Sequence, residues 1–286
     1  MTTTDPSTPR PRSGVLTALG LVVIYVLLAA GLGNLLSGLV RDDQEAAQFA
    51  LGHLIPLPLG IALLLVYVRR TENAAEVWRE RPTPTLTPHR WYLIAIPVII
   101  VAQYVIAATE IPWAERTIGI IALVSVGTLM VGLGEELAVR GVLLTAVRQR
   151  HGEFATLLVT SLVFALAHIP GSIIEGDSLA LLAFKMFGLL IGGAGYYWVR
   201  RVSGRLWVGA LVHAFSDWAL YLSMDDVVPS ASMPQAHAFA DTVTGYVGIV
   251  LWVFLAIGVI SVLREDHRNR KRRQLEHDTV APETDR

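Results

Sequence analysis

The chain has 286 residues, of which 53% are hydrophobic and only 16% are charged, and its mean hydropathy is +0.52. Soluble proteins carry closer to a quarter charged residues, so this composition predicts an integral membrane protein. The absence of cysteine excludes disulfides, thiolate metal ligands and cysteine nucleophiles. The net charge of −1 and its distribution give no indication of a nucleic-acid partner.

Apolar runs long enough to cross a membrane recur along the whole chain. The first run, residues 14–40, has no charged residue and can cross about 30 Å of hydrocarbon as a helix. The predicted spans are 15–40, 46–68, 91–109, 117–139, 154–169, 178–199, 206–223 and 242–263. The sequence therefore predicts an all-α polytopic membrane bundle of about eight transmembrane helices.

Charges in the connecting segments alternate between two sides. One side carries arginines at 10, 12, 69, 70, 79, 81, 90, 148, 150, 200, 201 and 205 and in the run from Arg264 to Arg273. The other side is acidic, with RDDQE at 41–45, Glu110, Glu115, Glu175, Asp177, Asp225 and Asp226. The positive-inside rule makes the arginine-rich side cytoplasmic, so both termini are expected in the cytoplasm beside the bilayer.

This pattern divides the chain into three parts. Residues 1–13 and the basic tail 264–286 are polar and are predicted to be disordered, whereas residues 14–263 form the transmembrane domain. Aromatic residues near span ends are expected to be interfacial anchors: Trp91, Tyr92, Trp113, Tyr197, Trp198 and Trp207.

Several charged and polar residues fall inside the predicted spans, where each costs free energy and indicates a function. In GEELAVRG, Glu136 and Arg140 have the i,i+4 spacing of an ion pair on one helix face. Glu135 lies about 100° further round the helix, so it is expected to point elsewhere and to be free for chemistry. In HAFSD, His213 and Asp217 share a face by the same spacing.

A sixth polar residue, His168, ends the segment FALAH on the next predicted span. Glu135 lies 17 positions before the hairpin tip at Gly152 and His168 lies 16 positions after it. Two helices that leave one tip bring these residues to the same depth. Lys185, near the outer end of its span, is expected to extend toward the interface instead. Gly132 and Gly134 are expected to serve close helix packing.

GEELAVRG, FALAH and HAFSD resemble the EExxxR, FxxxH and HxxxN/D motifs of the CPBP membrane protease family, also called Abi. That family includes the type II CAAX prenyl proteases. The motifs occur in the family's order on separate predicted spans, within residues 135–217. The resemblance implies an eight-helix membrane endopeptidase that hydrolyses a peptide bond of a membrane-associated peptide or protein.

Carried over residue by residue, the resemblance makes Glu135 the general base that activates water, supported by Glu136 and Arg140. His168 would orient the water or bind a metal, and His213 with Asp217 would stabilise the oxyanion or complete a metal site. Some relatives have asparagine at the position of Asp217. An ionised aspartate cannot donate to an oxyanion, so Asp217 is protonated, holds His213 in position or ligates a metal.

Two mechanisms remain open from the residues. Glu135, His168, His213 and Asp217 are suitable ligands for a divalent metal, with zinc the first candidate. A metal-free mechanism with a glutamate base is the alternative. Of the 23 basic residues, only Lys185 and Lys271 are lysines. Such usage is associated with GC-rich bacteria, which places the protein in a bacterial plasma membrane and makes a prenylated substrate less expected.

Other functions are also compatible with these residues. The chain could be a non-proteolytic immunity or scaffold protein that retains the fold, or a transporter with a carboxylate proton relay. Each polar group also has a structural explanation. Glu136 and Arg140 could be an ion pair at the membrane boundary, and His168, His213 and Asp217 could make helix-packing hydrogen bonds.

Overall fold

The computed structural model describes residues 14–41, 43–224 and 238–280, and within these ranges the regular elements are all helices. Several predicted features lie outside the described residues: the N-terminus 1–13, the last residues 281–286, and the outer acids Asp42, Asp225 and Asp226.

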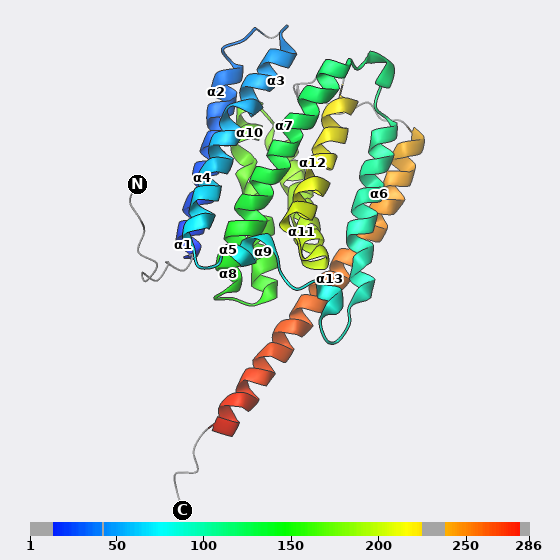
Figure 1. Ribbon diagram of the computed structural model, residues 1–286. Helices are drawn as coiled ribbons and strands as arrows, with labels where there is room; N and C mark the ends of the chain where they lie inside the picture. Colours follow the sequence, from blue (N-terminus) through cyan, green and yellow to red (C-terminus); the bar gives the residue numbers. More distant parts are fainter. Residues whose placement is uncertain (1–13, 42, 225–237, 281–286) are drawn as a thin grey trace, which may run out of the picture.

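The helices form one bundle, drawn in Figure 1. Its longer elements are α1 (Val15–Val26), α3 (Glu45–Leu54), α4 (Pro56–Arg70), α6 (Ala95–Thr109), α7 (Ile118–Glu136), α9 (Glu153–Ala167), α11 (Leu179–Ser203), α12 (Leu206–Ser223) and α13 (Ala238–Val280). The shorter α-helices are α2 (Gly33–Ser37), α5 (Ala74–Trp78), α8 (Leu144–Arg148) and α10 (Ile169–Ile174). Two π-helical segments, η1 (Leu27–Leu32) and η5 (Leu137–Leu143), and three 3₁₀ turns, η2 (Thr83–Thr85), η3 (Trp91–Ile94) and η4 (Trp113–Glu115), complete the set.

Within the described residues, seven helical segments are long and apolar enough to cross a membrane. They are Val15–Ser37, Glu45–Arg70, Trp91–Thr109, Ile118–Arg148, Glu153–Ile174, Leu179–Ser203 and Gly245–Glu276. The predicted span 206–223 forms α12 but is not among them, because His213 and Asp217 make it more polar. The prediction of an all-α polytopic membrane bundle is confirmed.

Helix α12 packs closely against α7, and the two helices run side by side in Figure 1. Their contact depends on Gly132: a Cβ atom there would overlap the carbonyl oxygen of Ala210 and come within 2.7 Å of the amide nitrogen of Ala214. Small residues let membrane helices approach to this distance. The close crossing brings the EExxxR and HxxxD motifs onto facing helices.

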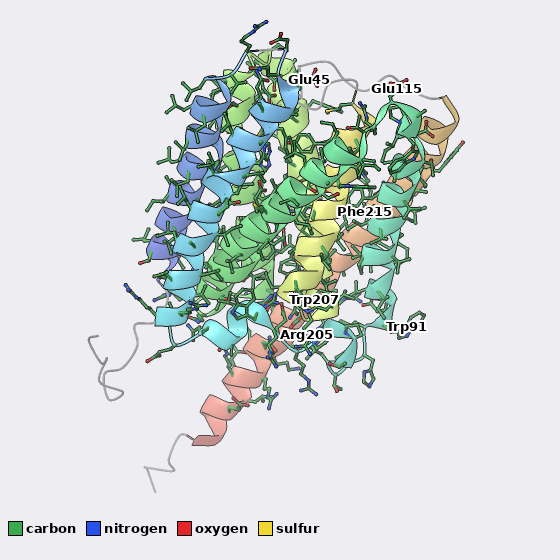
Figure 2. The ribbon with its side chains drawn as sticks, turned by 45° about the horizontal axis from the view of Figure 1, so that its top comes forward. Glu45, Trp91, Glu115, Arg205, Trp207 and Phe215 are labelled. Carbon is green, nitrogen blue, oxygen red and sulfur yellow. The ribbon has the colours of Figure 1, made fainter. Side chains whose placement is uncertain are left out.

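The two ends of the bundle differ as the charge pattern predicts. Figure 2 shows Trp91, Arg205 and Trp207 at one end and Glu45 and Glu115 at the other. The structure contains no membrane, so the cytoplasmic assignment of the arginine-rich end remains a prediction. The end that carries Arg205 is called the basic end.

The prediction of interfacial aromatic anchors is only partly right. Trp91, Trp113 and Trp207 are 71%, 47% and 58% exposed, as anchors should be. Tyr197 and Trp198 are instead fully buried in the core formed by α6, α9, α11 and α13. The sequence shows that Tyr197 and Trp198 lie near the end of a span. It does not show that neighbouring helices cover their side chains.

Glutamates from distant segments are paired with arginines at the basic end. Glu80 contacts Arg148, Arg200 and Arg201 at 2.9 to 3.2 Å. Arg201 also contacts Glu265 of α13 at 3.0 Å. These side chains are largely or fully buried, so each charge needs a partner, and the pairs connect the loop after α5, the end of α11 and α13.

The prediction of disorder for 264–286 is wrong for 264–280, which continue α13 as a helix. The charged composition suggested disorder, but the first residues of the tail have partners in the bundle. Glu265 pairs with Arg90 at 2.6 Å, and Asp266 accepts hydrogen bonds from the amides of Glu153 and Phe154 at the start of α9. These contacts fix the direction of α13, whose end extends beyond the other helices in Figure 1.

The α7–α12 crossing can be tested with a matched pair of glycine variants. We expect Gly132→Ala to lower the free energy of unfolding by about 1–3 kcal/mol, because the added methyl overlaps backbone that cannot move freely. Gly188→Ala is the control, since a Cβ there meets nothing within 4 Å. Unfolding in detergent, followed by circular dichroism, measures both, and equal stability of the two variants would contradict the tight crossing.

Candidate active site

Glu136 and Arg140 form a completely buried ion pair. The Oε1 atom of Glu136 lies 2.9 Å from Nη1 of Arg140, and both side chains are 0% exposed. Arg140 also donates to the carbonyl oxygen of Gly193 on α11 at 2.9 Å, and its guanidinium lies 4.3 Å from the ring centre of Phe164. A buried charge is tolerated only when it is compensated in this way. The predicted pairing of these residues is confirmed.

The same carboxylate reaches a histidine on the facing helix. Oε1 of Glu136 lies 3.3 Å from Nδ1 of His213, which is 3% exposed. A carboxylate can only accept, so Nδ1 carries the proton of this bond and Nε2 faces the other way. Tyr196 stacks on the His213 ring with 4.4 Å between ring centres and an interplanar angle of 18°. His213 is therefore held both at its edge and on its face.

Glu135 points away from the ion pair, as the helix geometry predicts. Its Oε2 atom lies 3.8 Å from Nε2 of His168 and 3.9 Å from Nε2 of His213. The Glu135 side chain is 22% exposed, whereas Glu136 is fully buried. One acid of the pair is thus used for structure, and the other faces two imidazole rings from different helices at distances longer than a direct hydrogen bond.

His168 is oriented by the helix that it ends. It is the C-cap of α9, and Pro170 starts α10 directly after it. Nδ1 of His168 lies 2.8 Å from the carbonyl oxygen of Phe164 one turn earlier. A carbonyl can only accept, so Nδ1 carries the proton and a neutral ring presents Nε2 as an acceptor toward Glu135. The hairpin argument from the sequence correctly placed Glu135 and His168 at one level.

Asp217 completes the cluster from one turn further along α12. Its Oδ2 atom lies 3.6 Å from Nε2 of His213, and its Oδ1 atom accepts a hydrogen bond from Ser216 at 3.2 Å. Of the three explanations offered for an aspartate here, this contact favours the one in which Asp217 holds His213. All six predicted site residues therefore lie in one connected cluster.

The sequence reasoning did not identify the aromatic wall of this site. Tyr196 bonds to Ser216 at 2.7 Å and to Tyr104 at 3.1 Å through its hydroxyl, while its ring covers His213. Phe164 lies against both His213 and Arg140. The sequence does show aromatic residues within the apolar spans. Such residues are too common in membrane helices for their presence to identify which of them line the site.

Lys185 does not belong to the cluster. Its Nζ atom pairs with Glu175 at 2.9 Å and with Asp177 at 2.6 Å in the loop that precedes α11. This agrees with the expectation that Lys185 extends toward the interface rather than toward a substrate.

The site residues include side chains that can act as metal ligands. Across the residues that the structure describes, no group of three or more His, Asp or Glu is arranged to hold a metal ion as it stands. The donor types nevertheless suit zinc, and each histidine has its Nδ1 atom occupied and its Nε2 atom directed at Glu135. Such a bond at the second nitrogen is what usually orients a metal-ligating histidine.

Fold and site together define a polytopic helical membrane protein with a buried acidic and imidazole cluster. Residues 117–219, from the start of α7 to α12, match the family model described as Type II CAAX prenyl endopeptidase Rce1-like. This match contains all three motifs and confirms the resemblance found in the sequence. At the family level it implies a membrane peptidase. No curated protein and no solved structure matches the chain.

The buried ion pair is open to a direct stability test. We expect Arg140→Met to lower the free energy of unfolding by about 3–5 kcal/mol, because Glu136 would keep a buried charge without a partner. Arg272→Met is the matched control, since Arg272 and Glu276 have the same i,i+4 spacing but are 81% and 64% exposed.

Exposed pairs contribute little, so the control is expected to unfold like the wild type. Denaturant titration in detergent measures both proteins. Equal stability of Arg140→Met and the wild type would show that the pair does not hold the site together.

Proposed function

We propose that this protein is a membrane-embedded endopeptidase that hydrolyses a peptide bond of a membrane-associated peptide or protein, using a water activated by Glu135. The single observation that carries the proposal is the position of Glu135. It is a partly exposed carboxylate, kept out of the neighbouring ion pair, that faces the Nε2 atoms of two histidines at 3.8 and 3.9 Å.

In the proposed reaction, Glu135 accepts a proton from water while the water oxygen forms a bond to the carbonyl carbon of the substrate. The carbonyl π electrons move to its oxygen, which becomes an oxyanion. When the carbon–nitrogen bond breaks, the proton held by Glu135 passes to the departing amine, and the products are a carboxylate and an amine. The Nε2 atom of His168 orients the water as an acceptor.

His213 and Asp217 act on the other side of the reacting carbonyl. Glu136 and the Tyr196 ring fix the His213 plane, and Asp217 lies at its Nε2 edge. We assign the imidazole to the stabilisation of the oxyanion, with Asp217 as the residue that positions it. Fixed dipoles of this kind need no reorganisation during the reaction, which is why they lower the barrier.

A divalent metal fits the donor types of Glu135, His168, His213 and Asp217, and zinc is the candidate that these donors favour. When bound, it would polarise the carbonyl and activate water as a Lewis acid. No step above depends on it.

The substrate class follows from the location of the site. The cluster lies between membrane helices, so the scissile bond must reach it from the bilayer or its surface. A membrane-associated peptide meets this requirement, and a leader or tail segment of a bacterial membrane protein fits it better than a prenylated chain in view of the arginine-rich composition. We place the protein in a bacterial plasma membrane with both termini in the cytoplasm.

Removal of the proposed base is the decisive activity test. We expect Glu135→Gln in reconstituted vesicles to reduce cleavage of a peptide library by at least about 100-fold, at unchanged expression and unfolding temperature. Product peptides are identified by mass spectrometry. The control is Glu45→Gln in the first turn of α3, at the end of the bundle away from Arg205 (Figure 2), which should cleave at the wild-type rate. Wild-type cleavage by Glu135→Gln would show that Glu135 is not the base, whereas no cleavage by the wild type would favour a non-proteolytic scaffold.

Metal dependence is tested by the metal content of the purified protein as well as by the rate of peptide cleavage. We expect purified wild-type protein to hold about one divalent ion per chain, and His168→Ala to lose it, because removal of one ligand weakens binding strongly. Elemental analysis by mass spectrometry measures the bound metal directly, and cleavage is followed before and after chelation. Active protein that holds no metal and is not inhibited by chelators would exclude the metal mechanism. The metal-free mechanism with a glutamate base would then be the explanation.

A further inference from the structure

Tyr25 lies on α1, outside the segment that matches the peptidase family. Its side chain is 3% exposed, and its hydroxyl oxygen has no hydrogen-bond partner among the residues that the structure describes. A buried hydroxyl without a partner is unfavourable for folding, and such groups in natural proteins require an explanation.

The tyrosine ring occupies a slot made by two glycines from different helices. A Cβ atom on Gly60 of α4 would come within 2.8 Å of the ring, and a Cβ atom on Gly134 of α7 would overlap the hydroxyl. Any other residue at Gly134 would therefore displace the hydroxyl. The absence of side chains at both positions is what lets a tyrosine reach this depth between α1, α4 and α7.

This slot places the hydroxyl against the helix that carries the proposed base. A Cβ atom on Gly134 would overlap the hydroxyl, and Gly134 directly precedes Glu135 on α7. Two other donor side chains near the site have partners. Arg140 is held by Glu136 and Gly193, and the Tyr196 hydroxyl contacts Ser216 and Tyr104. Tyr25 thus supplies an O–H donor that the protein itself leaves free.

We propose that the Tyr25 hydroxyl is a catalytic hydrogen-bond donor, which binds the carbonyl oxygen of the scissile peptide as that oxygen becomes negative. The inference rests on the proposed peptidase function and adds to it a residue from the first helix. Tyr25 keeps its proton throughout, so it contributes a hydrogen bond and no proton transfer. Together with the Nε2–H of a doubly protonated His213, it gives the oxyanion two donors from different helices, an arrangement typical of acyl-transfer sites.

Tyr25→Phe tests this role because it removes one oxygen and retains the packing of the ring. We expect kcat for an internally quenched peptide that the wild type cleaves to fall roughly 100-fold, as for the loss of one oxyanion donor. KM should stay within about twofold, because the bond strengthens only as charge develops. The unfolding temperature should be equal or higher, because an unpaired buried polar group has been removed.

Tyr92→Phe is the matched control, since this tyrosine is exposed at the basic end and should retain wild-type kcat and stability. A wild-type kcat in Tyr25→Phe overturns the proposal, and so does a loss of activity that is accompanied by lower stability. The Glu135→Gln variant distinguishes a failure of the proposed peptidase function from a failure of the proposed role of Tyr25. If the wild type cleaves, Glu135→Gln does not and Tyr25→Phe matches the wild type, the peptidase function stands and the role of Tyr25 fails. If Glu135→Gln cleaves like the wild type, both fail.

Discussion

The buried ion pair between Glu136 and Arg140 is the constraint on which the rest of the site depends. Charges in a dry interior need partners, and contacts from three helices compensate the charges of this pair. Arg140 connects to Gly193 on α11, and Glu136 connects to His213 on α12. The pair thereby fixes the relative positions of the helices that carry the reactive groups.

The consequence for chemistry is that two adjacent glutamates have different environments. Glu136 is neutralised locally and serves as a structural anchor for His213, whereas Glu135, about 100° round the helix, keeps its carboxylate available. The π-helical segment η5 begins directly after this pair, and such local widening of a helix is frequent at functional sites. Within one helical turn, the motif thus supplies one carboxylate that holds neighbouring side chains in place, Glu136, and one that stays available, Glu135.

The site is also shaped by segments that carry none of its motifs. Helix α1 contributes Tyr25, α11 contributes the ring of Tyr196, and glycines at helix crossings let these side chains approach the acidic cluster. At the basic end, buried arginine–glutamate pairs hold α11 and α13 together. The cluster of acidic and imidazole side chains therefore depends on the bundle as a whole, although the family match covers only residues 117–219.

The sequence alone predicted the membrane bundle, the eight helical segments and the six polar residues of the cluster, because hydrophobic length and the cost of charge in lipid leave few alternatives. It also predicted that Glu135 and Glu136 diverge, since that follows from helix geometry. It could not predict that Trp198 is buried, that residues 264–280 continue as a helix, or that Tyr25 reaches Gly134. Those features depend on contacts between helices far apart in the chain, and no local pattern of hydropathy or charge encodes which helices pack together.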